Sequence, residues 1–92
     1  MATISIWRGY RNLNADSDYE IVTFVGSEIG AVRFSDADAD IQYRVFRSEN
    51  ESVIIFFLER RDYDCEAEIY EYPNLTAAEK DYAFVLKKAG VI

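Results

Sequence analysis

Hydrophobic and polar positions alternate along most of the chain, a pattern that is typical of strands with one buried face. Two segments rich in β-branched and aromatic residues, Ala2 to Arg8 and Tyr19 to Val25, are separated by a polar stretch that predicts a loop. The glycine within Val25 to Glu28 predicts a turn, because glycine tolerates a positive φ. A third strand, Ile29 to Phe34, is then expected to form a hairpin with the second.

The middle of the chain predicts three further strands. Ile41 to Arg47 alternates between apolar and polar residues, which indicates a half-buried strand. Val53 to Leu58 is apolar at all six positions, so we expect a central strand that is covered on both faces. Polar turns at Ser48 to Ser52 and at Glu59 to Asp62 flank this strand, and Tyr63 to Tyr72 is expected to be the sixth strand.

A helix is predicted over residues 76–89. Thr76 and Glu79 have the spacing of a capping box, and Asp81 adds an acid that we expect in the first turn. Lys87 and Lys88 suit the last turn, and a glycine is expected to end the helix at Gly90. The apolar residues fall at helical spacing and form one stripe: Ala78, Tyr82, Val85, Leu86 and Ala89.

The order of these elements predicts an α+β fold of about six mostly antiparallel strands followed by one C-terminal helix. The helix is only ~20 Å long, so it cannot cover both faces of the sheet. We therefore expect the sheet to curl into a partial barrel, unless its second face is covered by another copy of the chain or is kept for a partner. The 92 residues contain no linker or internal repeat, which indicates a single domain over residues 1–92.

The composition narrows the chemistry that the chain can perform. There is no histidine, the single cysteine Cys65 has no second cysteine to pair with, and the four glycines match neither a P-loop nor a dinucleotide fingerprint. We therefore expect a protein that is not an enzyme and that uses no metal or cofactor. A lone thiol, the absence of a signal-peptide pattern and the shortness of the apolar runs predict a cytoplasmic protein without a membrane span.

The net charge of −7 is concentrated in residues 36–72, which hold eleven acids and four arginines. Strand alternation puts every second residue of the predicted sixth strand on one face and spaces successive carboxylates ~6.8 Å apart, so that the row resembles a line of phosphates. The row consists of Asp62, Asp64, Glu66 and Glu68, followed on the same face by Tyr70 and Tyr72. We expect it to bind a basic partner with the tyrosines as anchors; the alternative is a solvated acidic edge strand.

A second acidic group precedes the fourth predicted strand. Asp36, Asp38 and Asp40 share one side of an extended chain, and we expect them to enlarge the partner-binding surface. Their spacing resembles the opening of a calcium-binding loop, but the sixth and twelfth positions of such a loop hold Ile41 and Arg47 in place of glycine and glutamate. Weak calcium binding therefore stays an alternative, and no metal site is expected.

Arginines are interleaved with aromatic residues near the N-terminus. Arg8 and Arg11 surround Trp7 and Tyr10, a composition found in platforms that bind single-stranded nucleic acid. Further arginines follow at Arg44, Arg47, Arg60 and Arg61. A chain with a net charge of −7 repels phosphates, however, so we expect no tight direct binding to DNA or RNA.

In size, charge and tyrosine content the chain resembles the small acidic single-domain inhibitors that phages and mobile elements encode, of which anti-CRISPR proteins are the best known. This resemblance implies a non-catalytic protein that binds another protein. Together with the acidic row, it predicts an inhibitor that occupies a basic, nucleic-acid-handling protein by mimicking phosphates. A structural homodimeric module is the alternative from a different functional class.

Overall fold

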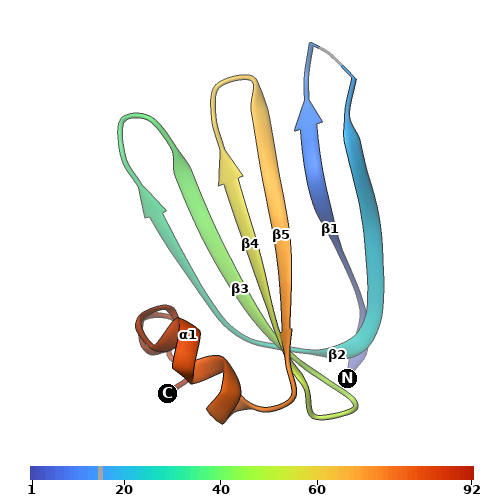
Figure 1. Cartoon of the computed structure of the whole chain (residues 1–92), viewed down its shortest axis with the longest axis vertical. Coiled ribbons are helices and arrows are strands. Elements are labelled where there is room, and N and C mark those ends of the chain that lie inside the picture. The colour runs from blue at the N-terminus through green and yellow to red at the C-terminus, as the bar shows by residue number, and fades with distance from the viewer. Residues whose placement is uncertain (15) are drawn as a thin grey trace.

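A computed structural model describes residues 1–14 and 16–92, in which five antiparallel strands close into a small barrel with one helix at the C-terminal end (Figure 1). Each strand pairs with its neighbours in the sequence, and β1 pairs with β5 to close the barrel. The elements are β1 (Ala2–Asn12), β2 (Asp18–Ser35), β3 (Asp40–Ser48), β4 (Val53–Arg60), β5 (Asp64–Tyr72) and α1 (Leu75–Lys88). The predicted α+β fold with a curled antiparallel sheet is confirmed.

The predicted turn at Val25 to Glu28 is wrong, because β2 runs through it as one strand of 18 residues. The first half of β2 pairs with β1 and the second half pairs with β3, so this one strand connects the two neighbouring strands of the barrel. The register shifts between Glu28 and Gly30, which indicates a β-bulge. At Gly26 an added Cβ would lie 2.4 Å from the carbonyl oxygen of Arg47. The glycine that suggested a turn therefore permits close packing between strands.

Strand β4 is buried on both faces, as its apolar sequence predicts, whereas pairing on both sides is common to all five strands of the closed barrel. Alternate residues of β4 enter two separate hydrophobic clusters. Ile54, Phe56 and Leu58 join the cluster inside the barrel, which includes residues of all five strands. Val53 and Ile55 join a second cluster, between the outer face of the sheet and α1. Curling of the sheet covers the inner face, and the helix covers part of the outer face.

The helix begins one residue earlier than predicted, and its cap is Asn74, not Thr76. The Asn74 side chain accepts a hydrogen bond from the backbone amide of Ala77 at 2.8 Å. Asp81, which was expected in the first turn, therefore lies beyond it. Its carboxylate accepts a hydrogen bond from the Tyr72 hydroxyl at 2.9 Å. The predicted apolar stripe is confirmed, since Ala78, Val85 and Leu86 are buried and Tyr82 and Ala89 pack against the same cluster.

The end of the helix follows the prediction. Lys87 and Lys88 lie in the last turn, and Gly90 follows the C-cap with a φ of 78°. The amides of Gly90 and Val91 donate to the carbonyls of Lys87 and Leu86, which is the pairing of a Schellman motif. Within residues 1–14 and 16–92, no helix has the length and apolar character that crossing a membrane requires.

Candidate acidic interface and barrel-seam groove

The acidic residues of β5 lie on the outer face of the barrel. Cys65, Ala67 and Ile69 pack with the inner cluster, so the alternate positions point outward, as the sequence predicts. Asp62 differs from the expectation, because β5 begins at Asp64 and Asp62 lies in the β4–β5 loop. We use the name acidic face for the outward carboxylates of this hairpin: Glu59, Asp64, Glu66 and Glu68.

Two of these carboxylates are free of basic partners. Among the described residues, no lysine or arginine nitrogen lies within 4.0 Å of the carboxylates of Glu66 or Glu68. Glu66 is directly opposite Glu59 on the neighbouring strand, and like charges in such pairs repel. Both Glu66 and Glu68 are exposed, and within residues 1–14 and 16–92 the Tyr70 hydroxyl is the one donor to the Glu68 carboxylate. This part of the face therefore keeps its negative charge.

Asp64 is held within the protein. Its carboxylate accepts a hydrogen bond from the Tyr10 hydroxyl at 3.2 Å and lies 3.5 Å from the guanidinium of Arg61. The same guanidinium reaches Glu59 at 2.6 Å. Asp64 is half-buried, and its Oδ1 accepts no hydrogen bond from the described residues. Asp64 thus links the β4–β5 hairpin to β1 and is less available to a partner than Glu66 and Glu68.

Tyr70 and Tyr72 share the outer face with the acids but pack against the helix. Their rings lie 5.6 and 6.0 Å from the ring of Tyr82, and the Tyr72 hydroxyl binds Asp81. Burial, and then the neighbouring charges, raises the pKa of Tyr82 to about 12. The two tyrosines that the sequence suggested as anchors are therefore part of the contact between sheet and helix.

The loop between β2 and β3 and the first residue of β3, Asp40, hold the second acidic group. Asp36 accepts hydrogen bonds from the amides of Asp38 and Ala39 at 2.8 and 2.9 Å, and these bonds lower its pKa. Arg33 binds the Asp40 carboxylate through both oxygens and lowers the pKa of Asp40. Asp38 is exposed. Of the three predicted carboxylates, those of Asp36 and Asp40 are therefore bound within the protein, and that of Asp38 stays available to a partner.

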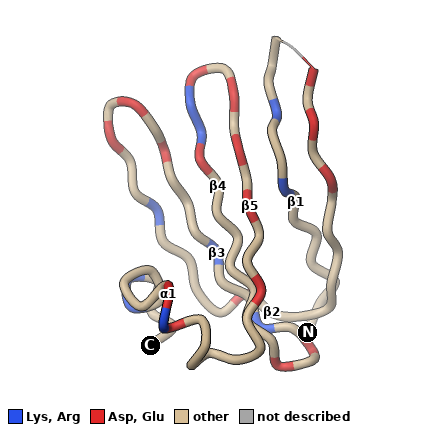
Figure 2. The backbone as a smooth tube through the Cα atoms, viewed as in Figure 1, with Lys and Arg blue, Asp and Glu red and all other residues tan. Residues whose placement is uncertain are grey.

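The structure brings this loop next to the β4–β5 loop. A shallow depression of about 270 Å³ is lined by residues 35–40 together with Arg60, Arg61 and Asp62. Figure 2 shows that acids gather at the loops of the hairpins and along β5. Asp36, Asp38, Asp40 and Asp62 thus share one end of the barrel, whereas Glu66 and Glu68 lie farther along β5. Within residues 1–14 and 16–92, no three acids or other metal-ligating residues are placed to hold a metal ion.

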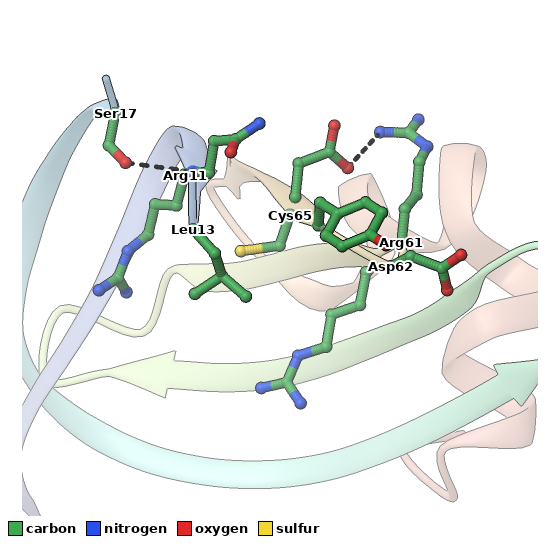
Figure 3. A pocket seen from close by; sticks show the side chains of 10 residues that line it. Arg11, Leu13, Ser17, Arg61, Asp62 and Cys65 are labelled. Carbon is green, nitrogen blue, oxygen red and sulfur yellow. Dashed lines mark hydrogen bonds and ion pairs between the residues drawn. The ribbon is translucent and has the colours of Figure 1, made fainter. Parts of the chain in front are cut away.

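A groove that the sequence did not suggest lies at the seam between β1 and β5, with a volume of about 460 Å³ (Figure 3). Cys65 lies in it, and Arg11 and Arg60 are its direct neighbours on the adjoining strands. The backbone amide of Leu13 donates to the carbonyl of Tyr63 at 3.1 Å and joins the two hairpins above the groove. The arginine and aromatic composition was visible in the sequence, but the pairing that assembles it was not.

No protein-family model, no curated protein and no solved structure matches this chain. Its own residues and their geometry are therefore the basis for assigning a function.

Proposed function

We propose that this chain is a non-catalytic protein-binding module whose acidic face occupies a basic, nucleic-acid-handling protein. The observation that supports this most directly is the group of Glu59, Glu66 and Glu68 on adjacent strands. Like charges in a cross-strand pair such as Glu66 and Glu59 are destabilising, and the ion pair of Glu59 with Arg61 offsets this repulsion only in part, since Glu66 has no basic partner among the described residues. A binding partner with lysines and arginines would remove this repulsion.

The geometry of the face suits a row of cations. Glu66 and Glu68 are two positions apart on one strand, so their carboxylates are spaced ~6.8 Å along β5. Asp62 and the exposed Asp38 continue the negative charge at the end of the barrel. The paired strands β4 and β5 hold Glu66 and Glu68 in place before binding, which reduces the entropy lost when the complex forms.

The net charge of −7 adds long-range attraction to the same partner. Such steering accelerates association and is screened over ~8 Å at physiological ionic strength. The proposal includes that the chain acts as an inhibitor of the phage-encoded type, which it resembles in size and charge. It would act in the cytoplasm, where a lone thiol such as Cys65 stays reduced. The proposal also includes the absence of tight direct binding to DNA or RNA.

The test is charge reversal at the two free carboxylates. The double variant Glu66→Lys, Glu68→Lys changes exposed side chains, whereas reversal of Asp64 would break its contacts with Tyr10 and Arg61. The matched control is Glu49→Lys, Glu79→Lys, which alters the net charge equally at exposed positions elsewhere. A basic protein captured from the native host by the wild-type chain is then assayed with all three proteins for association rate at several salt concentrations.

We expect the acidic-face variant to slow association about tenfold or more, with the control showing a smaller effect. The wild-type chain should also displace nucleic acid from the captured protein. Equal slowing in the two double variants would show that only net charge matters, and undiminished association of the first variant would place the interface elsewhere.

A structural homodimer is the second candidate, favoured by an exposed apolar stripe on β2. Ile21 and Val25 lie on one face of the strand, on either side of the exposed Thr23, and Ile21 is 66% exposed. If this stripe joins two copies, light scattering should give twice the chain mass at micromolar concentration, and Ile21→Lys should give the monomer mass. A monomeric wild-type chain at every concentration would exclude this candidate.

A further inference from the structure

The groove at the barrel seam is built around one cross-strand row. Arg11 on β1 is paired in register with Cys65 on β5, and Cys65 is paired with Arg60 on β4. Directly paired residues project to the same face of a sheet. Cys65 packs with the inner cluster, so both guanidinium groups belong to the inner side of the seam, away from the acidic face. Strands are spaced ~4.8 Å apart, which puts the two arginine Cα atoms about 10 Å from each other.

Neither arginine forms an ion pair with a carboxylate of the described residues, although, after the hydrogen bond from Arg33, the charge of Arg60 contributes to the lowered pKa of Asp40. Among the described residues, no acid lies within 4.0 Å of the guanidinium of Arg11 or of Arg60. Asp40 is the residue opposite Arg60 on β3, but Arg33 binds both of its oxygens. The Asp64 carboxylate contacts Arg61 and Tyr10. The chain has a net charge of −7, and yet two arginines without an ion-pair partner among the described residues line the same groove.

The position of Arg11 is fixed by aromatic rings. Its guanidinium carbon lies 4.5 Å from the ring centroid of Tyr19 and 5.2 Å from that of Trp7. Cation–π contacts of this kind orient a guanidinium but leave its N–H groups able to donate. In Figure 3, Leu13 and the Cys65 thiol lie between the two hairpins, and the side chains of Arg61 and Asp62 extend away from Arg11.

We propose that this groove binds a small organic anion, with a carboxylate or phosphate group between Arg11 and Arg60 and an apolar body against Leu13 and Tyr63. Guanidinium groups bind such anions through paired hydrogen bonds. Leu13 and Tyr63 are 85% and 66% exposed, and both line the groove. The proposal goes beyond the acidic interface, since it concerns the barrel seam, where three arginines (Arg11, Arg60 and Arg61) line the groove together with Asp62 and Asp64.

The size and surroundings of the groove favour a small ligand over a nucleic acid. Its volume of about 460 Å³ suits a molecule of a few tens of atoms at most. Asp62 and Asp64 line it, and Asp16 precedes the lining residue Ser17; these acids repel a polyanion but affect a compact anion less. A strand of DNA or RNA would meet these acids over its whole length.

The experiment uses phenyl phosphate and benzoate as probes, titrated into the full chain. Trp7, the only tryptophan, lies beneath Arg11 and reports binding by its fluorescence. Alkylation of Cys65 by iodoacetamide gives an independent readout, because a bound probe covers the thiol. We expect a Kd of about 1 mM or tighter for at least one probe, and slower alkylation of Cys65 at saturation.

Three variants locate the site. Arg11→Gln and Arg60→Gln should each weaken probe binding about tenfold, because each removes a charge-assisted hydrogen bond. Arg47→Gln is the matched control, since it removes the same charge outside the groove and should change the Kd less than about twofold. Thermal melting confirms that each variant is folded, and Arg60→Lys provides a second variant that keeps the charge.

The outcomes separate the alternatives. Binding of one probe only supports the proposal and identifies the anionic group as phosphate or carboxylate. Absence of saturable binding, unprotected Cys65, or an equal loss in Arg47→Gln and Arg60→Gln would overturn it. None of these results depends on Glu66 or Glu68, which do not line the groove, so the two proposals succeed or fail separately.

Discussion

Asn74 determines where the helix begins. Replacing it with alanine removes the hydrogen bond to the Ala77 amide and should lower the free energy of unfolding by about 0.5–2 kcal/mol. Thr76→Ala is the control, because Thr76 is exposed within the first turn and should change stability by less than about 0.5 kcal/mol. Urea denaturation of both variants measures the difference. A larger loss in Thr76→Ala would show that the capping box forms as the sequence suggested.

The charges of Asp36 and Asp40 are stabilised by different groups. Backbone amides lower the pKa of Asp36, whereas the Arg33 side chain is the main cause for Asp40. Arg33→Gln should therefore raise the pKa of Asp40 towards its usual 3.8 and leave that of Asp36 unchanged. Titration of the carboxyl carbons by NMR measures both values, and a parallel rise in the two would contradict the assignment.

The same two residues give a direction for the dependence of stability on pH. A carboxyl group with a lowered pKa in the folded state binds fewer protons there than in the unfolded chain. Its stabilisation is therefore complete above the unfolded pKa of about 3.9 and is lost as the pH falls through the folded pKa. We expect the urea concentration at the unfolding midpoint of the wild-type chain to decrease as the pH is lowered below about 4. The decrease should be less steep in Asp40→Asn.

At the scale of elements, the close pairing of β2 with β3 depends on a residue without a side chain, Gly26. A Cβ at position 26 would lie 2.4 Å from the Arg47 carbonyl oxygen, so Gly26→Ala forces β2 and β3 apart. We expect this variant to melt far below the wild-type chain or to remain unfolded. Gly90→Ala is the contrast, because a Cβ there meets no atom within 4 Å and only the positive φ opposes it, at about 1 kcal/mol. Equal melting temperatures for the two variants would show that a Cβ at position 26 does not clash with β3.

At the scale of the whole molecule, the surplus of negative charge should be visible in the response to salt. Glu66→Gln, Glu68→Gln removes two unpaired charges, one of them opposite Glu59, and should melt at or above the wild-type temperature in low salt. The difference should shrink as sodium chloride screens the repulsion. Glu49→Gln, Glu79→Gln changes the net charge equally without a cross-strand like pair. A lower melting temperature for the first variant would mean that Glu66 and Glu68 stabilise the fold.

Much of the fold follows from patterns that span a few residues. The apolar run from Val53 to Leu58 predicts the central strand, and helical spacing predicts the stripe that packs on the sheet. Alternation predicts that Glu66 and Glu68 face away from Cys65. These predictions hold because strands and helices impose periods of two and 3.6 residues on the burial of side chains.

The tertiary structure decided everything that depends on which strands are neighbours. A glycine followed by polar residues looks the same in a turn and in a strand that bends, so only the pairing of β2 with both β1 and β3 shows that the strand continues. The geometry of the hairpins determines which acids stay free: Arg33 on β2 engages Asp40 on β3, and Arg61 in the β4–β5 loop engages Asp64, three residues further on. The row of Arg11, Cys65 and Arg60 exists only because β1 closes on β5. Local periodicity fixes the face of each side chain, whereas cross-strand register, set by packing between distant segments, fixes its neighbours.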